Sequence, residues 1–136
     1  MATRLYLFFN GDCEAAFRAY AKHLGGSDVM LMSFKGAPGA DSVGAEWQDK
    51  IMHGSMRLGD LVLMGSDAPP GRYDRPQGFR VNLSLETPEE AQRAFDALAD
   101  GGTVEMALQK TFFSPAFGQL RDRFAIPWQV MVDQPA

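Results

Sequence analysis

Two side chains in this 136-residue sequence have the chemistry of a catalytic or anion-binding site. His53 lies in an apolar stretch that predicts a strand, and an imidazole with an ordinary pKa of about 6.5 can act as a general base. Arg80 lies in an alternating stretch, and its planar guanidinium can bind a carboxylate, phosphate or phosphonate through two hydrogen bonds. Each also has a structural interpretation. His53 can be a hydrogen-bonded group of the sheet, and Arg80 can pair with Glu86 or Asp133 or line a dimer interface.

Two further reactive side chains, Cys13 and Asp67, are expected to be structural. Cys13 is the only cysteine, so the chain forms no internal disulfide. It stands between Asp12 and Glu14, whose charges oppose a thiolate at the start of a helix. Asp67 follows an apolar stretch and suits a turn or a helix cap. His53 is therefore the candidate catalytic residue.

The helices that position these side chains come in two copies. The segment Glu14-x-Ala16-x-Arg18-Ala19-Tyr20 recurs as Glu89-x-Ala91-x-Arg93-Ala94-Phe95, at an offset of 75 residues. Asp12 is a candidate cap for the first helix, and Thr87-Pro88-Glu89-Glu90 is a capping box for the second. A pair of glycines follows each copy, and the apolar residues recur at helical spacing. The pattern predicts a duplicated module.

Apolar and alternating stretches predict the strands around these helices. They cover residues 5–9, 29–34, 51–58 and 61–66 in the first half, then 79–85, 104–108 and 128–132 in the second, with an irregular stretch before the last. Each half is therefore predicted as βαβββ, which makes an α+β fold. Module one covers about residues 3–67, a linker about 68–77 and module two about 78–133, within one domain of 1–136.

Composition excludes several classes of protein. Hydrophobic residues make up 46% and charged residues 22%, which excludes disorder, and no apolar run is long enough to span a membrane. A net charge of -4 without a basic cluster argues against nucleic acid as a partner. The N-terminal residues lack the order of a signal peptide, so the cytoplasm is the expected location.

Several motifs spread along the chain carry a family resemblance. They are Phe8-Phe9-Asn10-Gly11-Asp12-Cys13, Ile51-Met52-His53, Ser66-Asp67, Thr111-Phe112-Phe113, Asp122-Arg123-Phe124 and Pro127-Trp128. The chain resembles the PhnB-like branch of the vicinal oxygen chelate superfamily, which includes glyoxalases, extradiol dioxygenases and bleomycin-resistance proteins. The resemblance implies a glyoxalase-like domain with a concave mixed sheet, a small organic ligand and a homodimer. It also favours His53 as a functional residue, because the shared motif includes that position.

The superfamily typically holds a divalent metal with His, Glu, Asp or Gln side chains at inward strand positions. Aligned with that pattern, the ligand positions are Leu5, Met64, Arg80 and Gln129. Leucine has no lone pair, a thioether is a poor ligand for hard ions and a guanidinium is a cation, so only Gln129 suits a metal. We therefore expect no metal cofactor. A site made of Met64, His53 and Gln129 is the remaining alternative.

Strand alternation then predicts the surface that contacts the ligand. Leu5 and Arg80 are also 75 residues apart, so both are expected to face inward, with Tyr6 and Phe8 facing the helix. The predicted ligand-binding residues are Leu5, Leu7, Met64, Arg80, Asn82 and Gln129. Such a surface is apolar on one side and polar on the other, which suits an amphipathic or anionic organic ligand.

These observations favour a metal-independent protein that binds a small molecule. A second hypothesis is an enzyme, either a lyase or isomerase with His53 as base and Arg80 as anion clamp, or a dioxygenase-like enzyme with rearranged metal ligands. A third is a purely structural or interaction protein.

Overall fold

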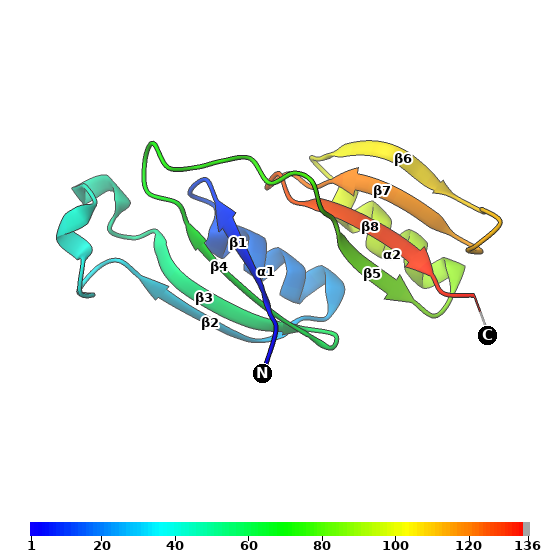
Figure 1. Ribbon diagram of the computed structural model, residues 1–136, viewed down its shortest axis with the longest axis horizontal. Helices are drawn as coiled ribbons and strands as arrows, with labels where there is room; N and C mark the ends of the chain where they lie inside the picture. The colour runs from blue at the N-terminus through cyan, green and yellow to red at the C-terminus, as the bar shows by residue number, and fades with distance from the viewer. Residues whose placement is uncertain (135–136) are drawn as a thin grey trace. The chain divides into compact units, whose positions relative to one another are not determined.

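The structure, a computed structural model, describes residues 1–134. It contains β1 (Leu5–Phe9), α1 (Cys13–Leu24), β2 (Ser27–Ser33), the short 3-10 helices η1 (Ala40–Ser42) and η2 (Ala45–Trp47), β3 (Ile51–Leu58), β4 (Leu61–Asp67), β5 (Val81–Leu85), α2 (Pro88–Ala99), β6 (Thr103–Gln109), β7 (Phe117–Arg121) and β8 (Pro127–Val132) (Figure 1). The chain divides into two compact units, Met1–Asp74 (unit 1) and Arg75–Ala136 (unit 2). Each unit runs strand, helix, three strands, so the predicted βαβββ order is confirmed.

Each unit is a four-stranded mixed sheet with one helix across one face (Figure 1). The strand order is β1-β4-β3-β2 in unit 1 and β5-β8-β7-β6 in unit 2. In both units the first and last strands pair in parallel, and the other neighbours pair antiparallel. Strand β7 lies within the stretch that looked irregular in sequence. It is a short strand between two partners, β6 and β8.

The two helices are capped differently. On α2, the Thr87 hydroxyl accepts a hydrogen bond from the Glu90 amide at 3.2 Å, as the capping box predicts. On α1, Asp12 occupies the cap position but its side chain makes no capping hydrogen bond, so that part of the prediction is wrong. The carboxylate of Asp67 accepts from the Cys13 amide at 2.9 Å instead. The start of α1 is therefore held by a residue at the end of strand β4.

The core of each unit lies between the helix and the sheet. In unit 1 the Phe17 ring packs over two strand glycines, since a Cβ atom at Gly65 would lie 3.2 Å from it and one at Gly54 would lie 3.4 Å from it. In unit 2 a Cβ atom at Gly118 would lie 2.7 Å from the Phe95 ring. Glycine in the central strands thus leaves room for an aromatic ring of the helix.

Neither helix among residues 1–134 has the length and apolar character needed to cross a membrane.

Candidate functional site

The face of the sheet that the helix leaves uncovered, here called the open face, differs from the prediction in unit 1. Leu7 and Phe9 are 2% and 0% exposed, and the Phe9 ring contacts the Phe17 ring of α1 at 6.0 Å between centroids. Leu5 has the same parity on the strand, so Leu5 and Leu7 face the helix. Phe8, which was expected to face the helix, is 54% exposed. The predicted orientation of this strand, and with it Leu5 and Leu7 as ligand contacts, is corrected.

The error comes from one loop residue. The helices α1 and α2 begin 75 residues apart, but β1 and β5 begin 76 apart. Residues 10–12 join β1 to α1, whereas only 86–87 join β5 to α2. Gly11 has a φ of +96°, a conformation that few other residues adopt, and it accommodates the longer turn. A shift of one residue exchanges the two faces of a strand, so Arg80 corresponds to Arg4 and not to Leu5.

The open face of unit 1 carries aromatic and thioether side chains. Tyr6 pairs with Met64 across β1 and β4, and Met64 pairs with Ser55 on β3, so these three share the face. The Tyr6 hydroxyl lies 3.2 Å from Nδ1 of His53, and the two rings are stacked at 5.7 Å between centroids. Met64 and His53 therefore occupy the open face, and both are half-buried. The bond to Tyr6 fixes the orientation of the imidazole.

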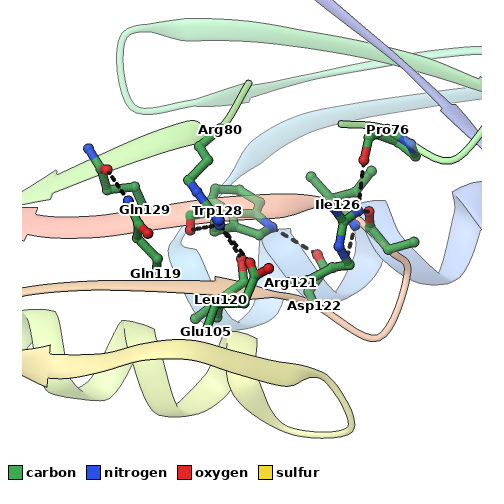
Figure 2. Close-up of polar contacts among 11 residues, drawn as sticks. Pro76, Arg80, Glu105, Gln119, Leu120, Arg121, Asp122, Ile126, Trp128 and Gln129 are labelled. Atoms are coloured by element: carbon green, nitrogen blue, oxygen red, sulfur yellow. Dashed lines mark hydrogen bonds and ion pairs between the residues drawn. The ribbon is translucent and has the colours of Figure 1, made fainter. Parts of the chain in front are cut away.

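The open face of unit 2 is polar, and the predicted orientation is found there. Arg80 directly precedes β5, and its Nη1 atom donates to a carboxylate oxygen of Glu105 at 2.8 Å and to the carbonyl oxygens of Leu120 and Trp128 at 3.2 Å (Figure 2). The structural interpretation of Arg80 expected an acidic partner, and the partner is Glu105, not Glu86 or Asp133.

Three arginine side chains act on the carboxyl of Glu105. The hydrogen bond from Arg80 is the main cause that lowers the pKa of the Glu105 carboxyl below its usual value, and the charges of Arg80, Arg121 and Arg75 lower it further. The Arg80 side chain is 27% exposed and that of Glu105 37%. The ion pair is accordingly reachable by solvent, and a second anion can approach it.

Beside Arg80, three side-chain amides form what we call the amide row, Gln119, Gln129 and Asn82. The Gln119 amide nitrogen donates to Gln129 Oε1 at 3.0 Å, a contact visible in Figure 2. The Gln129 nitrogen donates to Asn82 Oδ1, also at 3.0 Å. These residues are direct cross-strand partners on β7, β8 and β5. The row crosses three strands on the open face.

The metal positions of the superfamily can now be reassigned. With the offset of 76, the pairs Tyr6–Met64 and Asn82–Gln129 are equivalent in the two units. Of these four side chains only the two amides have an oxygen that suits a hard divalent ion, and none of the four carries a negative charge as the ordinary ligand set does. Within residues 1–134, no three His, Cys, Asp or Glu side chains gather closely enough to hold a metal ion.

Sequence reasoning missed three residues of these faces, Tyr6, Glu105 and Gln119. The all-apolar run of β1 contains no alternation that could have assigned Tyr6 to the open face. Glu105 reaches Arg80 across a sequence separation of 25 residues. Gln119 lies in β7, whose bounds were not predicted; its position 10 residues before Gln129 becomes informative only once the β7–β8 hairpin is known.

Known proteins resemble this chain over nearly its full length. The family model described as 3-demethylubiquinone-9 3-methyltransferase matches residues 2–131. Protein YjdN of Escherichia coli strain K12 is 36% identical over 135 residues, which cover 93% of this chain and 92% of YjdN.

Several solved structures also resemble this chain over nearly its full length. Protein PA1353 from Pseudomonas aeruginosa matches with a TM-score of 0.88 and 39% identity, covering 99% of both chains. A putative 3-demethylubiquinone-9 3-methyltransferase, PhnB protein, from Bacillus cereus matches with a TM-score of 0.79 and 21% identity, covering 97% of this chain and 99% of that one. A glyoxylase/bleomycin resistance protein/dioxygenase domain from Frankia sp. EAN1pec shares the fold, with a TM-score of 0.66 at 16% identity and 98% of both chains covered. The chain therefore belongs to the PhnB-like family, described as 3-demethylubiquinone-9 3-methyltransferase, and has the glyoxalase-like fold of the vicinal oxygen chelate superfamily.

Proposed function

We propose that this chain binds a small organic ligand that carries a carboxylate, phosphate or phosphonate group, on the open face of unit 2. The supporting observation is the charge around Glu105. Arg80 pairs with Glu105 at 2.8 Å, and the charges of Arg121 and Arg75 also act on this carboxylate. These cations attract an anion placed there, and Arg80, Asn82 and Gln129 contribute hydrogen-bond donors.

Arg80 is held in place for such a contact. Within residues 1–134 its hydrogen bonds all involve Nη1, which has three acceptors, Glu105, Leu120 and Trp128. A guanidinium has five N–H donors, so donors remain for a ligand. Because the protein has already fixed the side chain, less conformational entropy is lost when an anion binds.

The proposal includes no resident metal and no methyl transfer. The donors at the reassigned metal positions are uncharged, which favours direct binding of the ligand by side chains. A methyltransferase that uses a nucleotide-like methyl donor is expected to have a glycine-rich loop between a strand and a helix. Here the loop after β1 is Asn10-Gly11-Asp12 and the loop after β5 is Glu86-Thr87.

Phenylphosphonate is a suitable first probe, since it joins an apolar ring to an oxyanion. We expect Arg80→Gln to weaken its binding at least about tenfold, because hydrogen bonds to charged groups contribute about 1.5–3 kcal/mol. Arg93→Gln, on the exposed surface of α2, is the matched control and leaves binding unchanged. Isothermal titration calorimetry measures the affinity of the wild type and of both variants for phenylphosphonate. Equal affinities in wild type and Arg80→Gln would refute the proposal.

The metal-free part of the proposal has its own test. Elemental analysis of protein purified without chelator is expected to find less than stoichiometric zinc, manganese and nickel. A near-stoichiometric metal that a chelator removes, with loss of thermal stability, would overturn this part.

A second candidate function is general base catalysis by His53. It is favoured by the bond between Tyr6 and Nδ1 of His53, which orients the ring. The role requires the tautomer in which Nδ1–H donates to the Tyr6 hydroxyl oxygen, because Nε2 then has the lone pair that accepts a substrate proton. If a metabolite screen finds an activity, His53→Ala should abolish it and Tyr6→Phe should reduce it. An activity that is unchanged in His53→Ala would exclude this role.

We also propose that the chain acts as a homodimer in the cytoplasm; the family resemblance supports the dimer. Sedimentation velocity at micromolar concentration tests the dimer, and a single monomeric species would remove it.

A further inference from the structure

The amide row continues to a carboxylate and thereby has a direction. The Asn82 amide nitrogen donates to the Ser84 hydroxyl at 2.9 Å, and the Ser84 hydroxyl donates to Asp133 Oδ1 at 3.3 Å. With the two bonds of the row, every donor points toward Asp133. The hydrogen bonds run in the order Gln119, Gln129, Asn82, Ser84, Asp133.

The direction follows from the chemistry of one end. An ionised carboxylate can only accept, so the hydroxyl of Ser84 must donate to Asp133 and its lone pairs receive Asn82. The Asn82 nitrogen is then committed to Ser84, so its oxygen faces Gln129. An amide could lie either way round, because its oxygen and nitrogen ends have nearly the same shape. The Ser84 hydroxyl could also take either role, since a hydroxyl can donate or accept a hydrogen bond. Among these five side chains, only the ionised carboxylate of Asp133 cannot exchange the role of acceptor for that of donor.

We infer that Asp133 sets the donor direction of the amide row and thereby fixes where the row presents N–H donors to a ligand oxygen. The oxygens of Asn82 and Gln129 each accept one hydrogen bond within the row. Each of the three amide nitrogens has two hydrogens, and within residues 1–134 one hydrogen bond is found on each. The face therefore offers a line of N–H donors to a carbonyl, carboxylate or phosphoryl oxygen.

This inference rests on the proposed ligand site and names a residue that positions its donors. Asp133 is a positioning residue, because it acts through Ser84 and the amides. Its role also predicts the opposite of simple electrostatics. Removing a carboxylate from the same face should by itself strengthen anion binding, because like charges repel. If Asp133 sets the direction, its removal should weaken binding, because the amides then populate the reversed arrangement and present oxygens to the anion.

The experiment measures phenylphosphonate binding in Asp133→Asn and in Ser84→Ala, which removes the link between the amide row and Asp133 without changing charge. We expect both variants to bind about fivefold more weakly, the equivalent of one neutral hydrogen bond. Asp60→Asn, at the exposed turn between β3 and β4, controls for the change in net charge. Tighter binding in Asp133→Asn, or unchanged binding in Ser84→Ala, would overturn the inference while leaving the proposed function intact.

A measurement without ligand tests the donor direction set by Asp133 separately from the proposed ligand site. In the side-chain amide region of a ¹H–¹⁵N NMR spectrum, Ser84→Ala is expected to shift Asn82 and also Gln129 and Gln119, which make no hydrogen bond to Ser84. A shift confined to Asn82 would mean that no direction is transmitted, and would refute the inference. If the shifts reach Gln119 but wild type does not bind phenylphosphonate, the direction stands and the proposed ligand site fails.

Discussion

Replacing Asp67 by asparagine is expected to destabilise unit 1 more than any other change of one carboxylate to an amide among its described residues. The Asp67 carboxylate is 2% exposed, and its two oxygens accept from the Cys13 amide at 2.9 Å and the Ile51 amide at 2.8 Å. These amides begin helix α1 and strand β3. The Asp67 side chain at the end of β4 thus accepts hydrogen bonds from the first backbone amides of two other elements.

The size of the effect follows from these two bonds. Hydrogen bonds to a charged acceptor contribute about 1.5–3 kcal/mol each, and a neutral one about 1 kcal/mol. The amide of Asp67→Asn keeps one oxygen and turns its NH₂ group toward the second backbone N–H, which is left unsatisfied. The expected loss in the free energy of unfolding is about 2–4 kcal/mol. Domains of this size have only about 5–15 kcal/mol in total, so the change is large.

Hydrogen exchange monitored by mass spectrometry is the appropriate assay, because it distinguishes unit 1 from unit 2. Exchange should accelerate most at the amides of Cys13 and Ile51, and urea should unfold unit 1 at a lower concentration. Thr87→Ala removes the neutral cap of α2 and serves as the reference, at about 1 kcal/mol. The reasoning fails if Asp67→Asn costs no more than Thr87→Ala, or if both amides stay protected.

Three further predictions concern single residues. Burial, followed by the charges of nearby carboxylates, raises the pKa of the Cys13 thiol, so it should react with Ellman's reagent only after unfolding; rapid reaction of the native protein would contradict this. The lowered pKa of Glu105 means that its bond to Arg80 persists above the usual glutamate pKa and is lost as the pH falls through the lowered value. NMR titration of the carboxyl carbon should therefore give a midpoint that rises in Arg80→Gln, and a midpoint unchanged by that substitution would exclude the ion pair. Gly118→Ala should cost about 1–3 kcal/mol by overpacking, because its Cβ atom would lie 2.7 Å from the Phe95 ring; an unchanged melting temperature would argue against that contact.

Local signals in the sequence predict the elements well. The run Leu5–Phe9 and the stretch Ile51–Leu58 have the bounds of β1 and β3, and the capping box before α2 is found as expected. These features depend on neighbouring residues only. The alternation in β5 also assigns Asn82 to the open face without reference to any other part of the chain.

Orientation and partners are harder to predict, because they depend on distant residues. The strand β1 is apolar throughout, so its facing was taken from the helix offset, which the extra loop residue makes wrong by one. Asp67 and Glu105 find their partners through contacts between elements far apart in sequence. No spacing rule gives these pairs before the sheet order is known.

The loop between β1 and α1 also bears on how the two halves of the chain diverged. One residue more or less in this turn leaves the helix and the sheet pairing in place, yet it exchanges every side chain on the strand between the core and the open face. A duplicated module can thus acquire a new set of ligand contacts through a single insertion or deletion, without any substitution in the strand. When contacts are transferred between the halves of related proteins, the length of this turn must be counted first, because an alignment anchored on the helices pairs core residues with surface residues.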